Sequence, residues 1–145
     1  MNKHLLADLD PYTAAPETDT LGFTPLAVGW LTRQRPIATG KVPANFVAHL
    51  LAFCEVGNVV FPWPRPQPCP FCGALPPSEV DGRAYTPGLG EIRVIGEEEI
   101  YAAPSLIYHY VVAHNYQPPA EFVTAVLHGP QPGTAEYNAL VRSLR

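Results

Sequence analysis

The sequence feature that most constrains the fold is a CxxCG turn at residues 69–73, followed further along the chain by a pair of histidines. Two thiols separated by two residues and two imidazoles separated by four are the ligand set of a tetrahedral structural zinc site. Gly73 allows the backbone to fold back, so that both sulfurs can face one ion. We therefore expect one structural zinc ion per chain, held within a zinc-binding module at residues 69–114 by four ligands: Cys69, Cys72, His109 and His114.

The spacing of the two histidines sets a condition on the helix that carries them. Two residues five positions apart lie roughly 140° apart around an ideal α-helix. His109 and His114 can therefore face one ion only if the last helical turn tightens or unwinds. Asn115 and the following Pro118-Pro119 pair favour a helix end at this point. The order of a CxxC turn, a hairpin and a helix with two histidines resembles that of a ββα zinc finger.

Other interpretations of the same residues remain open at the level of sequence. Four protein ligands leave no position for water, which disfavours a catalytic ion. A redox-active CxxC normally begins a helix, whereas prolines flank this one. Cys54, His49 or His128 could replace one predicted ligand, although Cys54 lies on the apolar side of a predicted helix and is expected to be a core residue. A set of sulfur and nitrogen ligands would also accept iron.

Composition restricts the class of protein. At 145 residues with 47% hydrophobic side chains, the chain is expected to form one domain, 1–145, while 18 prolines work against long regular elements. The formal net charge of −4 argues against a nucleic-acid surface. No apolar run reaches the length of a membrane span or a signal peptide. Three cysteines, two of them in a CxxC, favour the reducing cytoplasm.

Periodicity and turn residues predict a small α+β domain with a β-hairpin, three to four short helices and proline-rich loops. Residues 1–25 are predicted to be an irregular arm, 62–68 a polyproline rod, and 74–89 a loop. The predicted strands are 26–31, 59–61, 91–95 and 99–101, the last two forming a half-buried hairpin. The predicted helices are 43–54, 104–114, 118–128 and 134–144.

Several short blocks together resemble a family of small bacterial proteins of uncharacterised function. The resemblance covers residues 8 to 127 and rests on CPFC at 69–72, GEIRV at 90–94, and the run YAAPxLIxHYVxxHxYxPPxxF that begins at Tyr101. It implies a bacterial cytosolic protein that carries the CxxC and HxxxxH pairs, and it supplies no activity. The 56–68 segment and the tail after residue 128 fit the pattern least.

The function that these observations favour is a non-catalytic, zinc-binding partner of another protein, immunity-like or regulatory in kind. The closed metal site, the acidic balance and the lack of a local catalytic motif lead to this expectation. Trp63 is the aromatic residue best suited to a partner contact. One alternative is an enzyme whose site is assembled from scattered residues such as Arg93, Glu91, Tyr108 and His128. A second is nucleic-acid binding through the zinc module.

Overall fold

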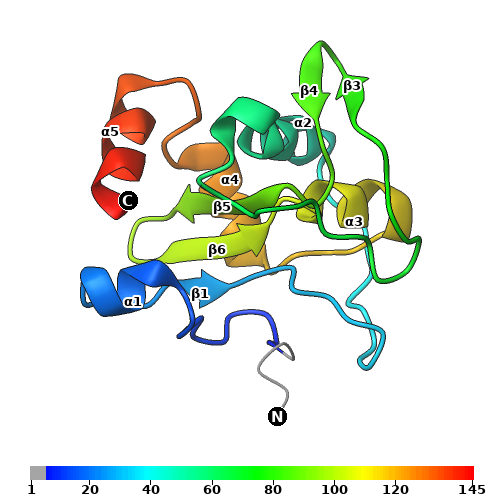
Figure 1. Ribbon diagram of the computed structural model, residues 1–145, viewed down its shortest axis with the longest axis horizontal. Helices are drawn as coiled ribbons and strands as arrows, with labels where there is room; N and C mark the ends of the chain where they lie inside the picture. The colour runs from blue at the N-terminus through cyan, green and yellow to red at the C-terminus, as the bar shows by residue number, and fades with distance from the viewer. Residues whose placement is uncertain (1–5) are drawn as a thin grey trace.

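The computed structural model describes residues 6–145 and shows a four-stranded sheet with α-helices around it (Figure 1). The sheet has the order β1-β6-β5-β2, and a separate two-stranded hairpin is formed by β3 and β4. The α+β class predicted from the sequence is confirmed. The strands are β1 Leu26–Ala27, β2 Phe61–Pro62, β3 Ser78–Val80, β4 Arg83–Tyr85, β5 Gly90–Ile95 and β6 Ile100–Pro104. The helices are α1 Pro16–Thr20, α2 Ala44–Cys54, α3 Ile107–His114, α4 Ala120–His128 and α5 Ala135–Leu144, with a 3-10 turn at Val56–Asn58.

The centre of the sheet is the predicted hairpin of β5 and β6, which pair antiparallel with Ile92 opposite Ala103. The prediction that this hairpin is half-buried is wrong for β5, since every residue from Gly90 to Val94 is buried. Successive side chains of a strand point to opposite faces, so the charged and apolar residues of β5 separate onto two sides. Glu91 and Arg93 lie on a face that a second layer of the chain must therefore cover.

That cover is supplied by the N-terminal segment, which the sequence analysis predicted to be irregular. The described part of this segment contains helix α1 and leads into β1, which pairs parallel with β6; residues 1–5 of the predicted arm lie outside the described residues. Glu17 of α1 is fully buried and forms an ion pair with Arg93, with 2.6 Å between Oε2 and Nε. Tyr12 donates a hydrogen bond of 2.8 Å to Glu91. These long-range contacts attach the segment to the sheet, which local periodicity does not reveal.

Helices α2 and α4 pack against each other and against β5, on the side opposite the N-terminal segment. Figure 1 shows them above and behind the central hairpin, with α5 at one end of the sheet and α3 at the other. Phe46 of α2 packs edge to face on Phe122 of α4, with 6.3 Å between ring centroids. The Phe122 ring also lies 5.8 Å from the Tyr101 ring of β6. Among residues 6–145, no helix has both the length and the apolar character that crossing a membrane requires.

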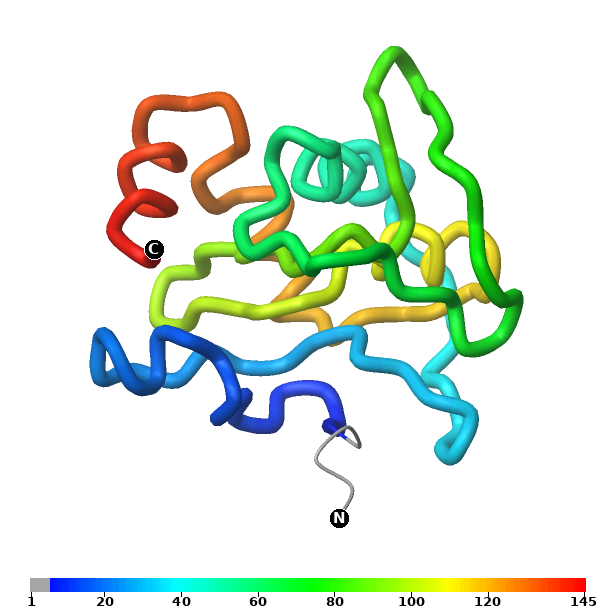
Figure 2. The backbone as a smooth tube through the Cα atoms, viewed as in Figure 1, coloured from blue at the N-terminus to red at the C-terminus, as the bar shows by residue number. Residues whose placement is uncertain are grey.

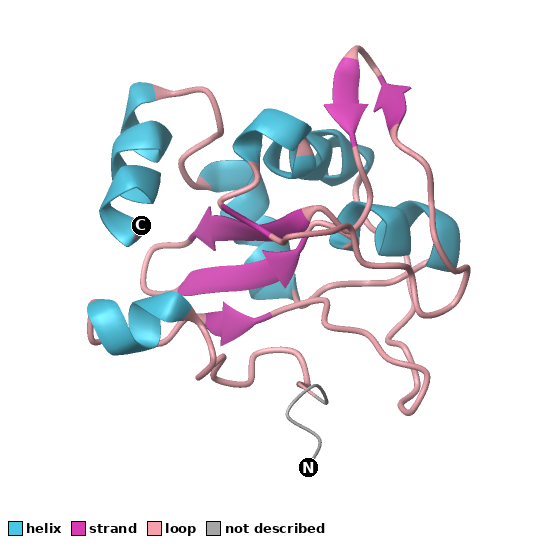
Figure 3. Ribbon diagram, viewed as in Figure 1, coloured by secondary structure: helices cyan, strands magenta, loops and turns pink. Residues whose placement is uncertain are grey.

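Much of the chain between these elements is loop, as 18 prolines would lead one to expect (Figure 3). The segment predicted to be a loop at 74–89 nevertheless contains the β3–β4 hairpin, whose turn is Asp81-Gly82 with both residues at positive φ. Two successive residues at positive φ define a type I′ turn, which suits the twist of a two-residue hairpin. In Figure 1 this hairpin projects away from the body of the molecule.

The proline-rich segment before the CxxC turn runs beside residues 88–89. Trp63 donates its backbone N–H to Leu89, and Gln67 donates to Gly88 at 2.8 Å. Trp63 is half-buried and packs against Trp30 at 6.3 Å between ring centroids, so it is less exposed than the sequence suggested. The close approach depends on Gly88, because a Cβ there would clash with the backbone carbonyl of Gln67.

Substitution Gly88→Ala is therefore expected to destabilise the protein and to displace the segment that leads to Cys69. Gly88 has φ +74°, so alanine adds backbone strain as well as the clash, and we expect a loss of about 2 kcal/mol or more in unfolding free energy. Chemical denaturation measures this loss. Gly82→Ala is the matched control, since Gly82 has φ +77° but open space at its Cβ position. Equal losses in the two variants would show that the contact with Gln67 contributes nothing.

Candidate metal centre

The CxxC turn is closed by backbone hydrogen bonds between its first and last residues. Cys69 donates its N–H to the Gly73 carbonyl at 3.0 Å, and Gly73 donates back to Cys69 at 2.8 Å. Gly73 has φ +88°, a conformation that glycine adopts without a steric penalty. The Phe71 N–H also points at the Cys69 sulfur, 3.4 Å away. The turn therefore holds both sulfurs on one side, with Cys69 buried and Cys72 exposed.

Helix α3 meets the condition that the spacing of its histidines imposes. Its last turn is wider than an α-helical turn, because the Asn115 N–H bonds to the carbonyl of Tyr110, five residues back. Asn115 itself is in the left-handed conformation expected of a helix C-cap, with φ +56°. This widening lets residues five positions apart share one side of the helix. The rings of His109 and His114 consequently lie 5.0 Å apart between centroids.

The two halves of the predicted ligand set lie together in space. The CxxC turn passes beside the end of α3 (Figure 2), and one ligand atom from each of the four residues lies within 4.8 Å of the other three. His114 Nε2 is 3.2 Å from the Cys72 sulfur and 3.6 Å from the Cys69 sulfur. A tetrahedral zinc site with Zn–S of about 2.3 Å and Zn–N of about 2.05 Å has S···N edges of about 3.6 Å. The group could hold a metal ion.

One atom of the group lacks the partner that its burial demands. His109 Nε2 is buried and has no hydrogen-bond partner among the described residues. A buried polar atom without a partner is costly, and a metal ion would supply that partner. Burial, followed by the neighbouring His114, lowers the pKa of His109. The imidazole is therefore favoured in its neutral form, which is the form that ligates metals.

The pKa of the Cys72 thiol is affected by its surroundings in a way that a bound cation would reverse. Partial desolvation, and then the nearby Cys69, raise the pKa of Cys72. A second thiolate beside the first is disfavoured because the two negative charges repel. A bound divalent cation inverts this balance and stabilises both thiolates. Metal binding at this site is therefore expected to release protons.

Aromatic rings enclose the cluster on its protein side. Phe71, between the two cysteines, lies 5.1 Å from the His114 ring and 6.2 Å from Tyr110 between centroids. Tyr110 is itself buried in the core. These rings fix the orientation of His114. The sequence indicated Tyr110, on the helix that carries the histidines, as a residue that packs around the metal site, whereas Phe71 was not singled out. The signal available in the sequence was the aromatic residue inside the CxxC turn.

The residues considered as replacement ligands lie elsewhere. Cys54 is buried in the hydrophobic core, where burial raises the pKa of its thiol to about 12. His49 contacts Gln131, with 2.9 Å between Nδ1 and Oε1. His128 is exposed at the end of α4. Neither histidine belongs to the group of four.

The residues considered for a scattered active site do not converge. Arg93 and Glu91 form an ion pair of 3.0 Å, and both take part in the buried network with Glu17. Tyr108 packs edge to face on Tyr85 within the core. These three side chains are therefore engaged in holding the fold together, and His128 lies apart from them on α4.

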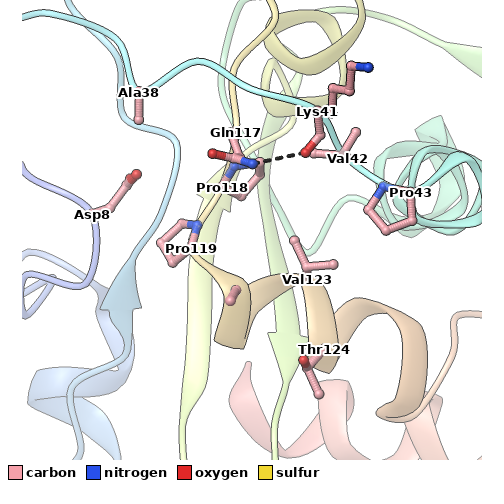
Figure 4. Close-up of a pocket in the computed structure, with 11 residues that line it drawn as sticks. Asp8, Ala38, Lys41, Val42, Pro43, Gln117, Pro118, Pro119, Val123 and Thr124 are labelled. Atoms are coloured by element: carbon pink, nitrogen blue, oxygen red, sulfur yellow. Dashed lines mark hydrogen bonds between the residues drawn. The ribbon is translucent and has the colours of Figure 1, made fainter.

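Apart from the cysteine–histidine cluster, a hollow of about 580 Å³ lies between the start of α4 and the loop before α2 (Figure 4). Two of the polar side chains that line it already form hydrogen bonds within the protein. Gln117 donates a hydrogen bond to the Lys41 carbonyl, and Asp8 accepts hydrogen bonds from the Tyr116 hydroxyl and the Gly29 N–H. In Figure 4 the amine of Lys41 points away from the hollow. This hollow therefore offers a ligand fewer available polar groups than the cysteine–histidine cluster does.

Fold and cluster together define a small α+β domain with a Cys2His2 group able to hold a metal ion. Residues 4–127 match the family model described as "Domain of unknown function (DUF7919)", and the chain belongs to this family. The matched range includes all four cluster residues and ends before α5. No curated protein and no solved structure matches the chain. The resemblance to an uncharacterised family is thus confirmed.

Proposed function

We propose that this protein is a zinc-binding, non-catalytic interaction domain that acts by binding another protein in the bacterial cytoplasm. Cys69, Cys72, His109 and His114 hold one structural zinc ion per chain. The observation that carries the proposal is the convergence of four ligand atoms, one from each residue, within 4.8 Å of one another. The buried His109 Nε2, which has no hydrogen-bond partner among residues 6–145, supports it. Two sulfurs and two imidazole nitrogens are a ligand set that zinc prefers.

A structural role follows from the number and placement of the ligands. Four protein ligands complete a tetrahedron, so no position remains for a water or a substrate. The ion would join the CxxC turn directly to α3, which follows β6 after a short turn. Its binding free energy would therefore stabilise the fold instead of driving a reaction.

Binding to another protein is the role that best suits such a closed site. The polar side chains with the most unusual environments, Arg93, Glu91 and Glu17, are committed to a buried network. The formal net charge of the chain, −4, favours protein partners over nucleic acid. Immunity-like or regulatory proteins act in this way, through a surface presented by a stable small scaffold.

The metal part of the proposal is tested by elemental analysis of the purified protein, combined with thermal unfolding in the presence of a chelator. We expect one zinc per chain and a large drop in melting temperature on chelation. Replacement by cobalt(II) adds a readout of the ligands, since thiolate coordination gives an intense charge-transfer absorption. Iron in the purified protein would contradict the assignment of the ion, and a metal-free protein with an unchanged melting curve would contradict the site.

The interaction part is tested by affinity purification from the native host. The bait is the zinc-loaded wild type, and the control is the same protein after the metal has been stripped. A stoichiometric complex with one identified protein, lost on stripping, supports the proposal. A zinc-loaded monomer that remains alone across the tested conditions contradicts it.

A further inference from the structure

An open groove of about 730 Å³ lies at the end of the sheet opposite to the metal centre. Its walls come from the β5–β6 turn, from α4 and from the first turns of α5. In Figure 1 this is the end where α5 stands beside the turn, whereas α3 lies at the other end of β6. Helix α5 lies outside the residues matched by the family model, 4–127.

The floor of the groove is apolar. Ile95 is partly buried, Ala125 is buried, and Tyr101 is 4% exposed. Leu140 of α5 also lines the groove with 37% of its surface exposed, which makes it one of four large hydrophobic residues exposed in the described part of the chain. The groove therefore offers contact area to an apolar side chain.

The rim of the groove is acidic. Among residues 6–145, five exposed carboxylate residues line it together with His128, and no lysine or arginine does. No ion pair within residues 6–145 involves any of the five. Glu121 accepts a hydrogen bond of 2.7 Å from Tyr101. The other four carboxylate residues are exposed to solvent. The five are Glu97, Glu98, Glu99, Glu121 and Glu136.

Three of the five carboxylates act on the same point of the groove. The pKa of Tyr101 is raised by burial first, then by Glu121, with further contributions from Glu99 and Glu98. The negative field of the turn and that of α4 therefore overlap at the Tyr101 hydroxyl. Such a field favours a positively charged ligand and steers it during association.

We infer that this groove binds a lysine- or arginine-rich segment of a partner protein, with an apolar side chain of that segment seated against Leu140. Charge complementarity selects the basic occupant, and the apolar floor selects a peptide over a simple cation. This inference rests on the proposed function, because it gives the interaction domain its binding surface and the chemical class of its partner.

The test measures fluorescence anisotropy of a labelled 14-residue amphipathic peptide of lysine and leucine at low salt, using the zinc-loaded protein. The double variant Glu98→Gln/Glu99→Gln is expected to weaken binding about tenfold. Leu140→Ser is expected to weaken it by a similar factor of about ten. The matched control is Glu79→Gln/Asp81→Asn, which removes the same number of charges from the distant β3–β4 hairpin and should change affinity little.

Three outcomes would overturn the inference. The first is no binding of the basic peptide, and the second is an equal loss in the control variant, which would indicate attraction to net charge alone. The third is binding of spermine as tight as that of the peptide and indifferent to Leu140→Ser, which would indicate a small polyamine. Zinc content is measured on the same samples. Peptide binding without zinc would refute the metal centre alone, and zinc without peptide binding would refute the groove alone.

Discussion

Cys72→Ser is expected to lower the melting temperature of the protein by at least about 10 °C and to abolish stoichiometric zinc binding. Structural zinc contributes about 10 kcal/mol in finger peptides, which is comparable to the whole stability of a typical domain. Cys72 is the most informative ligand to replace because it is exposed, so that serine removes a ligand and no core packing. Calorimetry and elemental analysis on the same preparation measure both effects.

The control for this prediction is His128→Gln, which changes an exposed histidine outside the cluster and should leave both the melting temperature and the zinc content unchanged. His109→Ala should behave like Cys72→Ser. A Cys72→Ser protein with the melting temperature of the wild type would contradict a structural role for the metal, and the exposed thiol would then be free for other chemistry.

Arg93→Met is expected to destabilise the protein by about 3–5 kcal/mol, because it leaves buried carboxylates without their cation. The guanidinium is fully buried, bonds to both oxygens of Glu17 at 2.6 and 3.1 Å, and lies 4.7 Å from the Phe61 ring centroid. It also pairs with Glu91, which is 7% exposed. Urea denaturation of the variant and the wild type measures the difference in unfolding free energy.

A second substitution separates the cost of the orphaned charge from the value of the pair. Arg93→Met combined with Glu17→Leu removes the two fully buried charges and leaves Glu91, which is 7% exposed and still accepts a hydrogen bond from Tyr12. Replacing a buried ion pair by apolar side chains is often close to neutral. The double variant should therefore be more stable than Arg93→Met alone. Glu55→Gln serves as the control, since its ion pair with Arg83 is at the surface and is worth less than about 1 kcal/mol. A double variant less stable than the single one would show that the Glu17 carboxylate carries no penalty when its cation is absent.

Elements with strong local signals were predicted well. Pro43 and Gly57 bracket the predicted first long helix, and α2 occupies Ala44–Cys54 between them. The two strands predicted at 91–95 and 99–101 are found as β5 and β6. Asn115 caps α3 as expected. In each case the spacing of apolar residues and the capping residues agree with one another, so that local sequence is sufficient.

Elements that depend on distant contacts were not predicted. Helix α1 has only five residues, and it is held in place by the ion pair between Glu17 and Arg93, which are 76 positions apart. Strand β1 is limited to Leu26–Ala27, shorter than the predicted 26–31, because only these two residues pair with β6. The β3–β4 hairpin is different, since Asp81-Gly82 is a recognisable turn signal. The surrounding prolines outweighed it in the prediction of a loop.

The four residues of the candidate site could be found from spacing because metal ligands must be of a few types at short separations. Their convergence depends on features that spacing does not encode. The wide last turn of α3 and the position of Phe71 against His114 are set by packing in three dimensions. The acidic groove is harder still to foresee, because its carboxylates come from three separate elements.

The β3–β4 hairpin has a consequence for how relatives of this protein can be recognised. It lies between the CxxC turn and the sheet, and its tip at Asp81-Gly82 is exposed and projects from the body (Figure 1). Doubling the length of such a loop costs only about 0.6 kcal/mol in closure entropy. Evolution could therefore lengthen the tip of this hairpin without separating the cysteines from the histidines, whereas β4 is tied to the core by the buried Tyr85, which packs on Tyr108. Homologues should be sought by the two short motifs and the helix end that carries the second, with the distance between them left free.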